Sequence, residues 1–394
     1  MRALGVLLAT AAGLMAQPAF DSQKLLDGFL KQVSPTLERQ PNYTCLETVE
    51  RTRRSPGGAT QVEDTLRLEV ALVGDKEMFA WPGSKEFEDT EVTELVTAGM
   101  FGNGNFAIYP RMLFGGGGPA SMYGGEVEVN GRKTAQFNFQ VPRSRSGYRL
   151  SVNRQRAVVG YHGSFYVDLE TLDLKRVVVI LDMIPAEFNM TSSEDRVDYE
   201  RVRIGEERFL LPVESSLTMV FPDTVSRNRV RFTACRKFTG ESTLLFPEED
   251  PVAADAPAAA GPKEVSLPIG TQIPLTLTTE IVLAQGVVGD TVAAKISSNV
   301  KIGKDVLVPK GTIARGRIVK LERQLEVYVL TLHFTDLEWP GGHARLNMRV
   351  EDVNAVAQGR SQENFFRIAS DDIVISRNGP KRLKDLLLRG RVAP

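Results

Sequence analysis

Residues Leu267–Lys320 read LPIGTQIPLTLTTEIVLAQGVVGDTVAAKISSNVKIGKDVLVPKGTIARGRIVK. Short runs of alternating apolar and polar residues are separated by turns that contain Gly-Asp, Gly-Lys and Pro-Lys-Gly. Alternation with a period of two residues is typical of β-strands, and glycine and proline mark the turns between strands. The stretch therefore predicts a small closed β-barrel. It contains no cluster of side chains suited to chemistry, which favours a binding or assembly module.

The composition of the whole chain is that of an ordinary soluble protein. Its 394 residues suffice for two domains, and apolar residues make up 42% and charged residues 25%. The 48 basic and 49 acidic side chains nearly cancel, so no global field favours nucleic acid or an anionic membrane. Local charged patches remain compatible with this balance.

The N-terminus has the pattern of a secretory signal peptide. Arg2 is followed by an apolar run from Leu4 to Met15, and small residues near Ala16 fit a cleavage site. The run is too short to cross a bilayer, and no later segment reaches spanning length. We therefore predict a signal peptide over residues 1–16 and a mature protein exported to the periplasm or the periphery of the outer membrane.

A second compositional break divides the exported part. Residues 247–264, PEEDPVAADAPAAAGPKE, are rich in proline, alanine and acids and carry hardly any large apolar side chain. Such a segment cannot bury enough surface to order itself, so we predict a linker. The first domain then covers residues 20–246 and the second covers 265–394.

The first domain is predicted to begin with a helix and to continue as strands. Apolar residues recur every three or four positions over 21–39, where Asp21 or Ser22 can cap the start. Alternating segments then predict antiparallel strands over 43–53, 65–73, 126–129, 134–141, 148–156, 163–168, 175–181, 196–204, 217–221 and 228–238, with short helices over 92–100 and 106–114. The expected fold is mainly β (α+β), with a curved antiparallel sheet over an N-terminal helix.

Two segments of the first domain resemble a known family. The first strand YTCLETVERTRR and the hairpin GSFYVDLETLDLKRV, together with the preceding helix, resemble the half-barrel fold of LolA-type lipoprotein carriers. The resemblance covers most of residues 20–246 and implies a concave face that receives acyl chains. The pattern leaves open whether this sheet has an open cavity or a filled core.

The second domain is predicted to have strands over 272–278, 288–296, 305–308, 313–320, 326–334 and 344–350. Its end is predicted to be a helix, with Pro380 near the start, leucines at 383 and 386–388 on one side and Gly390 at the stop. The strings LPIGTQIPLTL, GDTVAAKI and VLVPKGTIARGRIV resemble the β-barrel domain of the conjugative-transfer TrbI family, which forms the core channel of type IV secretion systems. The chain lacks that family's inner-membrane anchor and pore-lining helical hairpin, so the resemblance implies a docking module and not a channel.

The two cysteines, Cys45 and Cys235, both fall in the first domain. Export to an oxidising compartment favours a disulfide between them, and two buried thiols are the alternative. The parity of the two strands argues against a simple pairing. Cys45 shares a face with Tyr43 and Val49, whereas Cys235 lies opposite the face of Val230 and Phe232.

No catalytic or metal site is predicted. Ser298 and Lys301 match Ser-x-x-Lys, but they lie among strands, where the serine cannot head a helix. His333 and His343 flank Asp336 and Glu338 without the spacing of a zinc site. No cofactor is expected, and a secreted hydrolase that uses Ser298 or His333 is the least favoured alternative.

Two further segments are candidate binding elements. The run Phe114–Pro119, with four consecutive glycines, lacks the Gly-Lys-Ser/Thr ending of a phosphate loop, so we read it as a flexible loop that could cover a sheet opening. Arg143, Arg145 and Arg149 lie close together in one strand region and form a candidate anion-binding patch. The alternative is that they belong to a solvated strand face without a binding role.

These observations together predict an exported, non-catalytic envelope protein. Its partners would be envelope proteins or an apolar, lipid-like ligand, and no nucleic acid. A lipid or lipoprotein carrier with an apolar cavity in the first domain is the alternative function.

Overall fold

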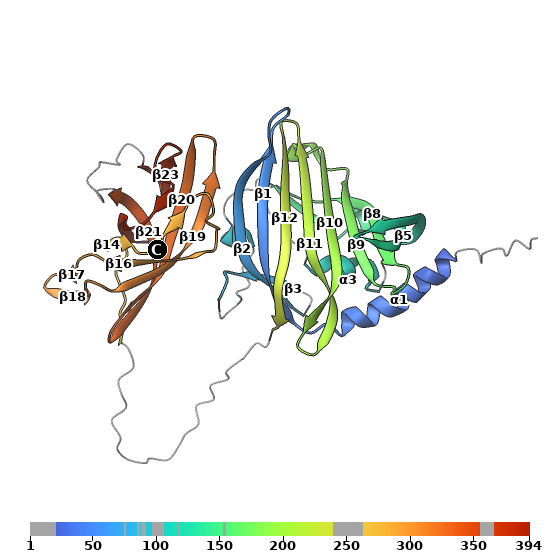
Figure 1. Ribbon diagram of the computed structural model, residues 1–394, viewed down its shortest axis with the longest axis horizontal. Coiled ribbons are helices and arrows are strands. Elements are labelled where there is room, and N and C mark those ends of the chain that lie inside the picture. Colours follow the sequence, from blue (N-terminus) through green and yellow to red (C-terminus); the bar gives the residue numbers. More distant parts are fainter. Residues whose placement is uncertain are drawn as a thin grey trace, which may run out of the picture.

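The computed structural model describes residues 21–74, 76–84, 87, 92–96, 106–116, 118–152, 155–238, 263–354 and 366–394. They form a long curved sheet flanked by helices and, beside it, a smaller barrel (Figure 1). The chain is therefore mainly β, as the sequence predicts. The predicted signal peptide and nearly all of the predicted linker lie outside the described residues.

The sheet of the first domain has ten antiparallel strands. Strand β1 shows why they form: YTCLETVERTRR turns Tyr43, Cys45, Glu47, Val49 and Arg51 inward on alternate positions. In spatial order the strands are β3 (Lys76–Ala80), β2 (Gln61–Val73), β1 (Tyr43–Arg54), β12 (Thr224–Lys237), β11 (Glu207–Phe221), β10 (Ser192–Ile204), β9 (Leu174–Asp182), β8 (Gly160–Asp168), β5 (Arg132–Val141) and β4 (Ser121–Val129).

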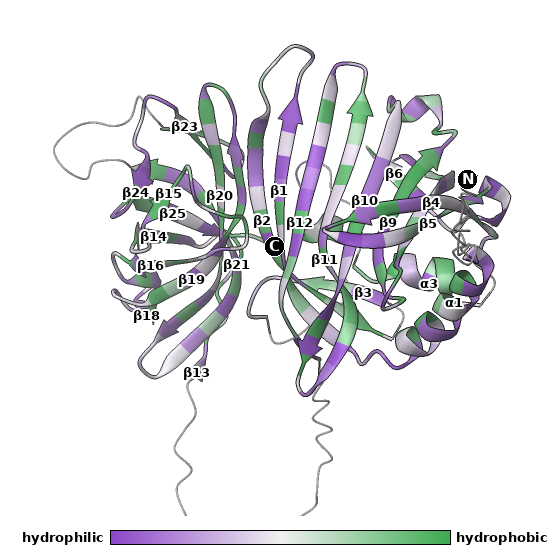
Figure 2. Cartoon of the chain, turned by 45° about the vertical axis from the view of Figure 1, so that its right-hand side comes forward, coloured by the Kyte–Doolittle hydropathy of each residue, from purple (hydrophilic) through white to green (hydrophobic). Residues whose placement is uncertain are grey.

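Helices cover one side of this sheet (Figure 2). Helix α1 (Ser22–Glu38) begins where Asp21 accepts a hydrogen bond from the Lys24 N–H, and it buries its apolar stripe. Two shorter helices follow, α2 (Val92–Leu95) and α3 (Ile108–Phe114), with 3-10 turns η1 (Arg143–Arg145) and η2 (Ala186–Phe188) between strands.

Two details of the first domain differ from the sequence prediction. The segment predicted as one strand over 148–156 is a hairpin of β6 (Arg149–Val152) and β7 (Gln155–Val158). Strand β3 was not predicted, because its KEMFA sequence is only five residues long and pairs with β2 at the edge of the sheet. Both errors arise from short elements, for which periodicity is a weak signal.

The second domain contains a closed barrel of six antiparallel strands. In order around the barrel these are β21 (Gly342–Asn354), β25 (Leu387–Val392), β14 (Gln272–Leu277), β16 (Thr291–Ile296), β19 (Ile313–Arg323) and β20 (Val327–Trp339), which pairs again with β21. The smaller strands are β13 (Lys263–Glu264), β15 (Ile281–Val282), β17 (Val300–Ile302), β18 (Asp305–Val308), β22 (Phe366–Ala369), β23 (Asp372–Ser376) and β24 (Arg382–Leu383).

The predicted C-terminal helix is wrong. Residues 387–392 form β25, which lies between β14 and β21 and closes the barrel. Leu388, Gly390 and Val392 alternate inward, and a Cβ at Gly390 would lie 2.5 Å from the Met348 sulfur. Gly390 is thus required by close packing and does not stop a helix. The local leucine spacing fits either structure, and pairing with two distant strands decides between them.

The two domains are joined by backbone hydrogen bonds. Strand β3 pairs only with Glu69–Val73, so the first half of β2 has a free edge. Val288 of the barrel occupies that edge: its N–H donates to the Thr65 carbonyl (2.9 Å), and its carbonyl accepts from the Arg67 N–H (2.8 Å). The Arg67 guanidinium also donates to Asp290 at 2.9 Å.

Gly289 makes this approach possible. Its φ of +102° is a conformation that favours glycine, and a Cβ there would lie 2.4 Å from the Arg67 carbonyl oxygen. Its N–H donates to Ile318 on β19, so the loop is bonded to the barrel wall as well as to the sheet. We call residues 287–290 the docking loop. The Gly-Asp turn of the opening stretch therefore connects two domains.

We expect Gly289→Ala to loosen the two domains. The added methyl group must push back the β2 backbone, so the free energy of unfolding should fall by at least about 3 kcal/mol. Small-angle scattering should show a larger radius of gyration, and thermal unfolding should begin earlier.

Gly303→Ala is the matched control. Gly303 also has a positive φ, +63°, but nothing lies within 4 Å of its added Cβ. It should cost only the backbone strain of about 1–2 kcal/mol and leave the radius of gyration unchanged. Equal effects of the two substitutions would contradict the role of the docking loop.

Candidate functional site

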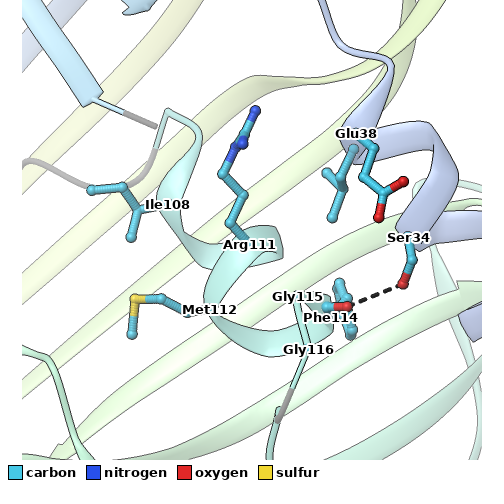
Figure 3. A pocket seen from close by; sticks show the side chains of 9 residues that line it. Ser34, Glu38, Ile108, Arg111, Met112, Phe114, Gly115 and Gly116 are labelled. Atoms are coloured by element: carbon cyan, nitrogen blue, oxygen red, sulfur yellow. Dashed lines mark hydrogen bonds between the residues drawn. The ribbon is translucent and has the colours of Figure 1, made fainter. Parts of the chain in front are cut away.

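A cavity of the first domain lies between α1 and α3. Helix α1 packs through Leu26, Phe29, Val33 and Leu37, all buried. The Ser34 hydroxyl donates to the Phe114 carbonyl at 3.1 Å and fixes the end of α3 against α1 (Figure 3). The two helices thereby enclose a space that the sheet alone would not.

This α1–α3 cavity has a volume of about 440 Å³. Its wall combines apolar and polar groups, as Figure 3 shows. The lining residues are Ser34, Leu37, Glu38, Ile108, Arg111, Met112, Phe114, Gly115 and Gly116. Sites for small ligands commonly measure about 300–1,000 Å³ and present a few polar groups on an apolar surface. The cavity therefore suits an amphiphilic molecule of modest size.

The space beneath the cavity is filled. The Phe29 ring lies 4.9 Å from Phe114 and 5.6 Å from Phe165, and Phe165 stacks on Phe137 at 5.3 Å. These rings are almost completely buried. The interior next to α1 and α3 is thus packed with aromatic side chains.

The glycine run after α3 forms part of the cavity wall. The Gly115 N–H donates to the Arg111 carbonyl at 2.9 Å and ends the helix. A Cβ at Gly115 would lie 2.4 Å from that carbonyl oxygen, and one at Gly118 would lie 2.0 Å from the Leu113 oxygen. These glycines therefore allow the chain to fold back tightly over α3, and residue 117 lies outside the described residues.

A polar cluster lies inside the sheet, between its two apolar regions. Glu47 on β1 and Asp195 on β10 are 1% and 4% exposed, and Tyr43 and Tyr199 are equally buried. Tyr109 on α3 donates to Asp195 at 2.8 Å. Other atoms of the cluster, Glu47 Oε2, Asp195 Oδ1 and the hydroxyls of Tyr43 and Tyr199, have no hydrogen-bond partner among the described residues.

Burial dominates the titration of this acid–tyrosine cluster. Desolvation, with a smaller contribution from Glu77, raises the pKa of Glu47 to about 8. Desolvation also raises the pKa of Asp195 to about 6, although the Tyr109 hydroxyl opposes it. The pKa values of Tyr43 and Tyr199 lie well above the ordinary range for the same reason. At neutral pH Glu47 is therefore largely protonated.

The structure brings the two cysteines together as a disulfide. Cys45 and Cys235 lie on neighbouring strands with their Cα atoms 4.1 Å apart. The register shifts between Thr44 and Leu46 of β1, and Ala234 on the partner strand has a φ of +50°. This bulge inserts one residue into β12 and turns Cys235 toward the face of Cys45. It removes the parity conflict seen in the sequence.

The arginine patch predicted at Arg143, Arg145 and Arg149 is exposed at the end of β5 and the start of β6. Ser298 lies in an exposed bend before β17. His333 on β20 contacts Asn347 on the neighbouring strand β21. His343 on β21 pairs with Glu338, which lies five residues after His333 on β20. That register separates the two histidines by about 16 Å. The structure does not bring these residues into one site.

Within the described residues no group of three or more His, Cys, Asp or Glu side chains is placed to hold a metal ion. None of the described helices is long and apolar enough to span a membrane.

Sequence reasoning missed Arg111, Glu47 and Asp195 as interior polar residues. A signal for Glu47 was present, because it shares the inward parity of Cys45 and Val49 on β1. No comparable local signal marked Arg111, which reaches the cavity only because α3 folds under α1.

The sequence matches no family model and no curated protein. Among solved structures, the chain is similar to a LolA superfamily protein from Nitrosomonas europaea, with 10% identity and a TM-score of 0.28 over 54% of this chain and 93% of that one. It is also similar to a putative outer membrane lipoprotein-sorting protein domain from Vibrio parahaemolyticus, with 9% identity and a TM-score of 0.30 over 56% and 94%. A DUF1329 family protein from Desulfovibrio piger is similar with 9% identity and a TM-score of 0.30, over 55% of this chain and 94% of that one. Scores this low carry no argument about function.

The acid–tyrosine cluster predicts that stability falls as pH rises. A carboxyl with a raised pKa binds its proton in the folded state when the unfolded chain has already released it. Between the ordinary 4.5 and about 8, Glu47 should lower the free energy of unfolding by up to about 1.4 kcal/mol per pH unit. Asp195 should steepen the decline between 3.8 and about 6.

Glu47→Gln should flatten this decline above pH 6 and make the variant more stable than the wild type above pH 8, in urea unfolding followed across pH. Glu50→Gln on the exposed face of the same strand is the control and should keep the wild-type slope. A wild-type slope in the Glu47 variant would show that this carboxyl titrates normally.

Proposed function

We propose that the chain is an exported, non-catalytic binding protein of the bacterial envelope, which holds an amphiphilic ligand in the α1–α3 cavity. The observation that carries this proposal is the composition of the cavity wall. Leu37, Ile108, Met112 and Phe114 offer an apolar surface, while Arg111 and Glu38 offer charge at its rim. An apolar tail and a polar head would both find partners there.

The filled core beneath the cavity favours binding over deep acyl-chain transport. A carrier of long lipids needs an apolar chamber, and the Phe29, Phe137 and Phe165 rings occupy the described interior. Lipid or lipoprotein transport therefore stands as the second candidate, and it requires α1 to move away from the sheet. The LolA-type strand pattern supports export and a binding role.

The barrel serves in this proposal as a docking module of the TrbI type. Its interior is packed with buried side chains such as Leu277, Phe334 and Met348, which leaves no room for a conduit. The hairpin of β17 and β18 presents Ile302 and Val306 to solvent, each nearly half exposed. An apolar tip of this kind fits a protein partner in the envelope.

Native mass spectrometry of the protein from intact cells tests the proposal. We expect a co-purifying amphiphile that is lost from Gly116→Trp, because an indole at this position would fill the cavity. Nothing lies within 4 Å of a Cβ at Gly116, so the substitution should not disturb the backbone.

Gly58→Trp in the turn between β1 and β2 adds the same side chain away from the cavity and should retain the ligand. A wild-type protein without any bound amphiphile, and without affinity for a fluorescent fatty acid, would overturn the proposal. Turnover lost on changing Ser298 or His333 to Ala would instead support the hydrolase alternative.

A further inference from the structure

A second surface of the first domain has a composition unlike the rest of the molecule. From Thr134 to Val167 the chain contains five arginines and not one aspartate or glutamate. Across the whole chain the two signs balance at 48 and 49. A run of 34 residues without an acid therefore creates a local positive field on a nearly neutral protein.

The fold exposes this charge. Arg143 and Arg145 lie on η1, and Arg149 starts β6; all three are exposed. The β6–β7 hairpin buries Leu150 against the aromatic core and so directs its alternate positions, including Arg149, outward. The segment is thus an amphipathic cover at the end of the sheet, with arginines on its outer side.

These three arginines lack the partners that others have. In the described part of the first domain, nine arginines form ion pairs with carboxylates: Arg51, Arg53, Arg67, Arg132, Arg176, Arg201, Arg203, Arg231 and Arg236. Arg143, Arg145 and Arg149 form no ion pair with any described carboxylate. Unpaired guanidinium groups keep all of their donors available to an external anion.

An exposed apolar side chain lies beside them. Met183 is 80% exposed and has a φ of +48°, a conformation that is unfavourable for methionine. Its neighbour Asp182 pairs in register with Gly160, where a Cβ would lie 3.0 Å from the Arg143 backbone nitrogen. Met183 and Arg143 therefore belong to one edge of the domain.

Little negative charge opposes this edge. The carboxylate of Asp182 contacts the His162 ring at 2.6 Å. In the turn from Met183 to Thr191 the sole acid is Glu187, against three arginines. We call Arg143, Arg145, Arg149 and Met183 the basic edge.

We infer that the basic edge docks the protein onto the surface of an anionic lipid membrane. The arginines would bind lipid phosphate groups, and Met183 would insert its side chain among the upper parts of the acyl chains. An anionic polymer could satisfy the arginines but would gain nothing from an exposed methionine. This inference does not depend on what the α1–α3 cavity holds.

Vesicle flotation tests the inference with the full chain. The wild type should float with vesicles in which a third of the phosphatidylcholine is replaced by phosphatidylglycerol, and it should remain unbound with phosphatidylcholine alone. Each arginine near an anionic surface contributes a factor of about five, so R143Q/R145Q/R149Q should bind roughly 100-fold more weakly. Salt above physiological strength should release the wild type.

Two further variants make the result specific. R39Q/R203Q/R208Q removes three arginines near the opposite end of the strands and should bind like the wild type. Met183→Ser should weaken binding several-fold, because it removes the inserted side chain. All of the changed residues are exposed, so circular dichroism should confirm folded proteins.

Equal binding of the basic-edge variant and the wild type would overturn the inference. So would an equal loss in the R39Q/R203Q/R208Q control, which would reduce the effect to net charge. Unchanged binding of Met183→Ser together with release by heparin would identify an anionic polymer as the partner instead of a membrane.

Discussion

The docking loop over residues 287–290 is the constraint on which the arrangement of the two domains depends. Val288 forms backbone hydrogen bonds to both Thr65 and Arg67 on β2, and the Gly289 N–H donates to the Ile318 carbonyl in the barrel wall. Asp290 adds a second tie, because one carboxylate oxygen accepts from Arg67 and the other from the Val287 N–H. The free half-edge of β2 is thereby covered, which protects it from pairing with other chains.

This constraint explains why buried residues of the two domains form one continuous apolar cluster. Leu66 on β2 and Val288 on the docking loop are both almost fully buried, and Trp81 of the first domain packs against the same cluster. Hydrogen bonds fix the register of the contact, while the apolar side chains supply most of its free energy.

An element could be predicted from the sequence when residues within its own segment determine its structure, and not when distant segments do. The strands of both domains follow from alternation within single segments, and α1 follows from its own three-and-four spacing and its Asp21 cap. The Cys45–Cys235 pairing could not be predicted from alternation, because a bulge at Ala234 changes which face of the sheet the end of β12 turns Cys235 toward. β25 was misread as a helix because its conformation is decided by β14 and β21, both more than 30 residues away in the sequence. The α1–α3 cavity needed two helices about 70 residues apart to meet, and no local pattern reports such a meeting.

Buried side chains pack the interiors of both the sheet and the barrel. Aromatic rings pack within the sheet, and buried side chains such as Leu277, Phe334 and Met348 pack within the barrel. The acid–tyrosine cluster is the polar exception inside the sheet. Several of its oxygens have no partner among the described residues, and burying them costs free energy that an all-apolar core would not lose. Because Tyr109 of α3 donates to Asp195 of β10, this cluster fixes the helix that forms the cavity wall. The Tyr109 hydrogen bond favours the ionised form of Asp195, whereas burial of the carboxyl opposes it, so the contact that holds α3 to β10 and the protonation of Asp195 are physically coupled.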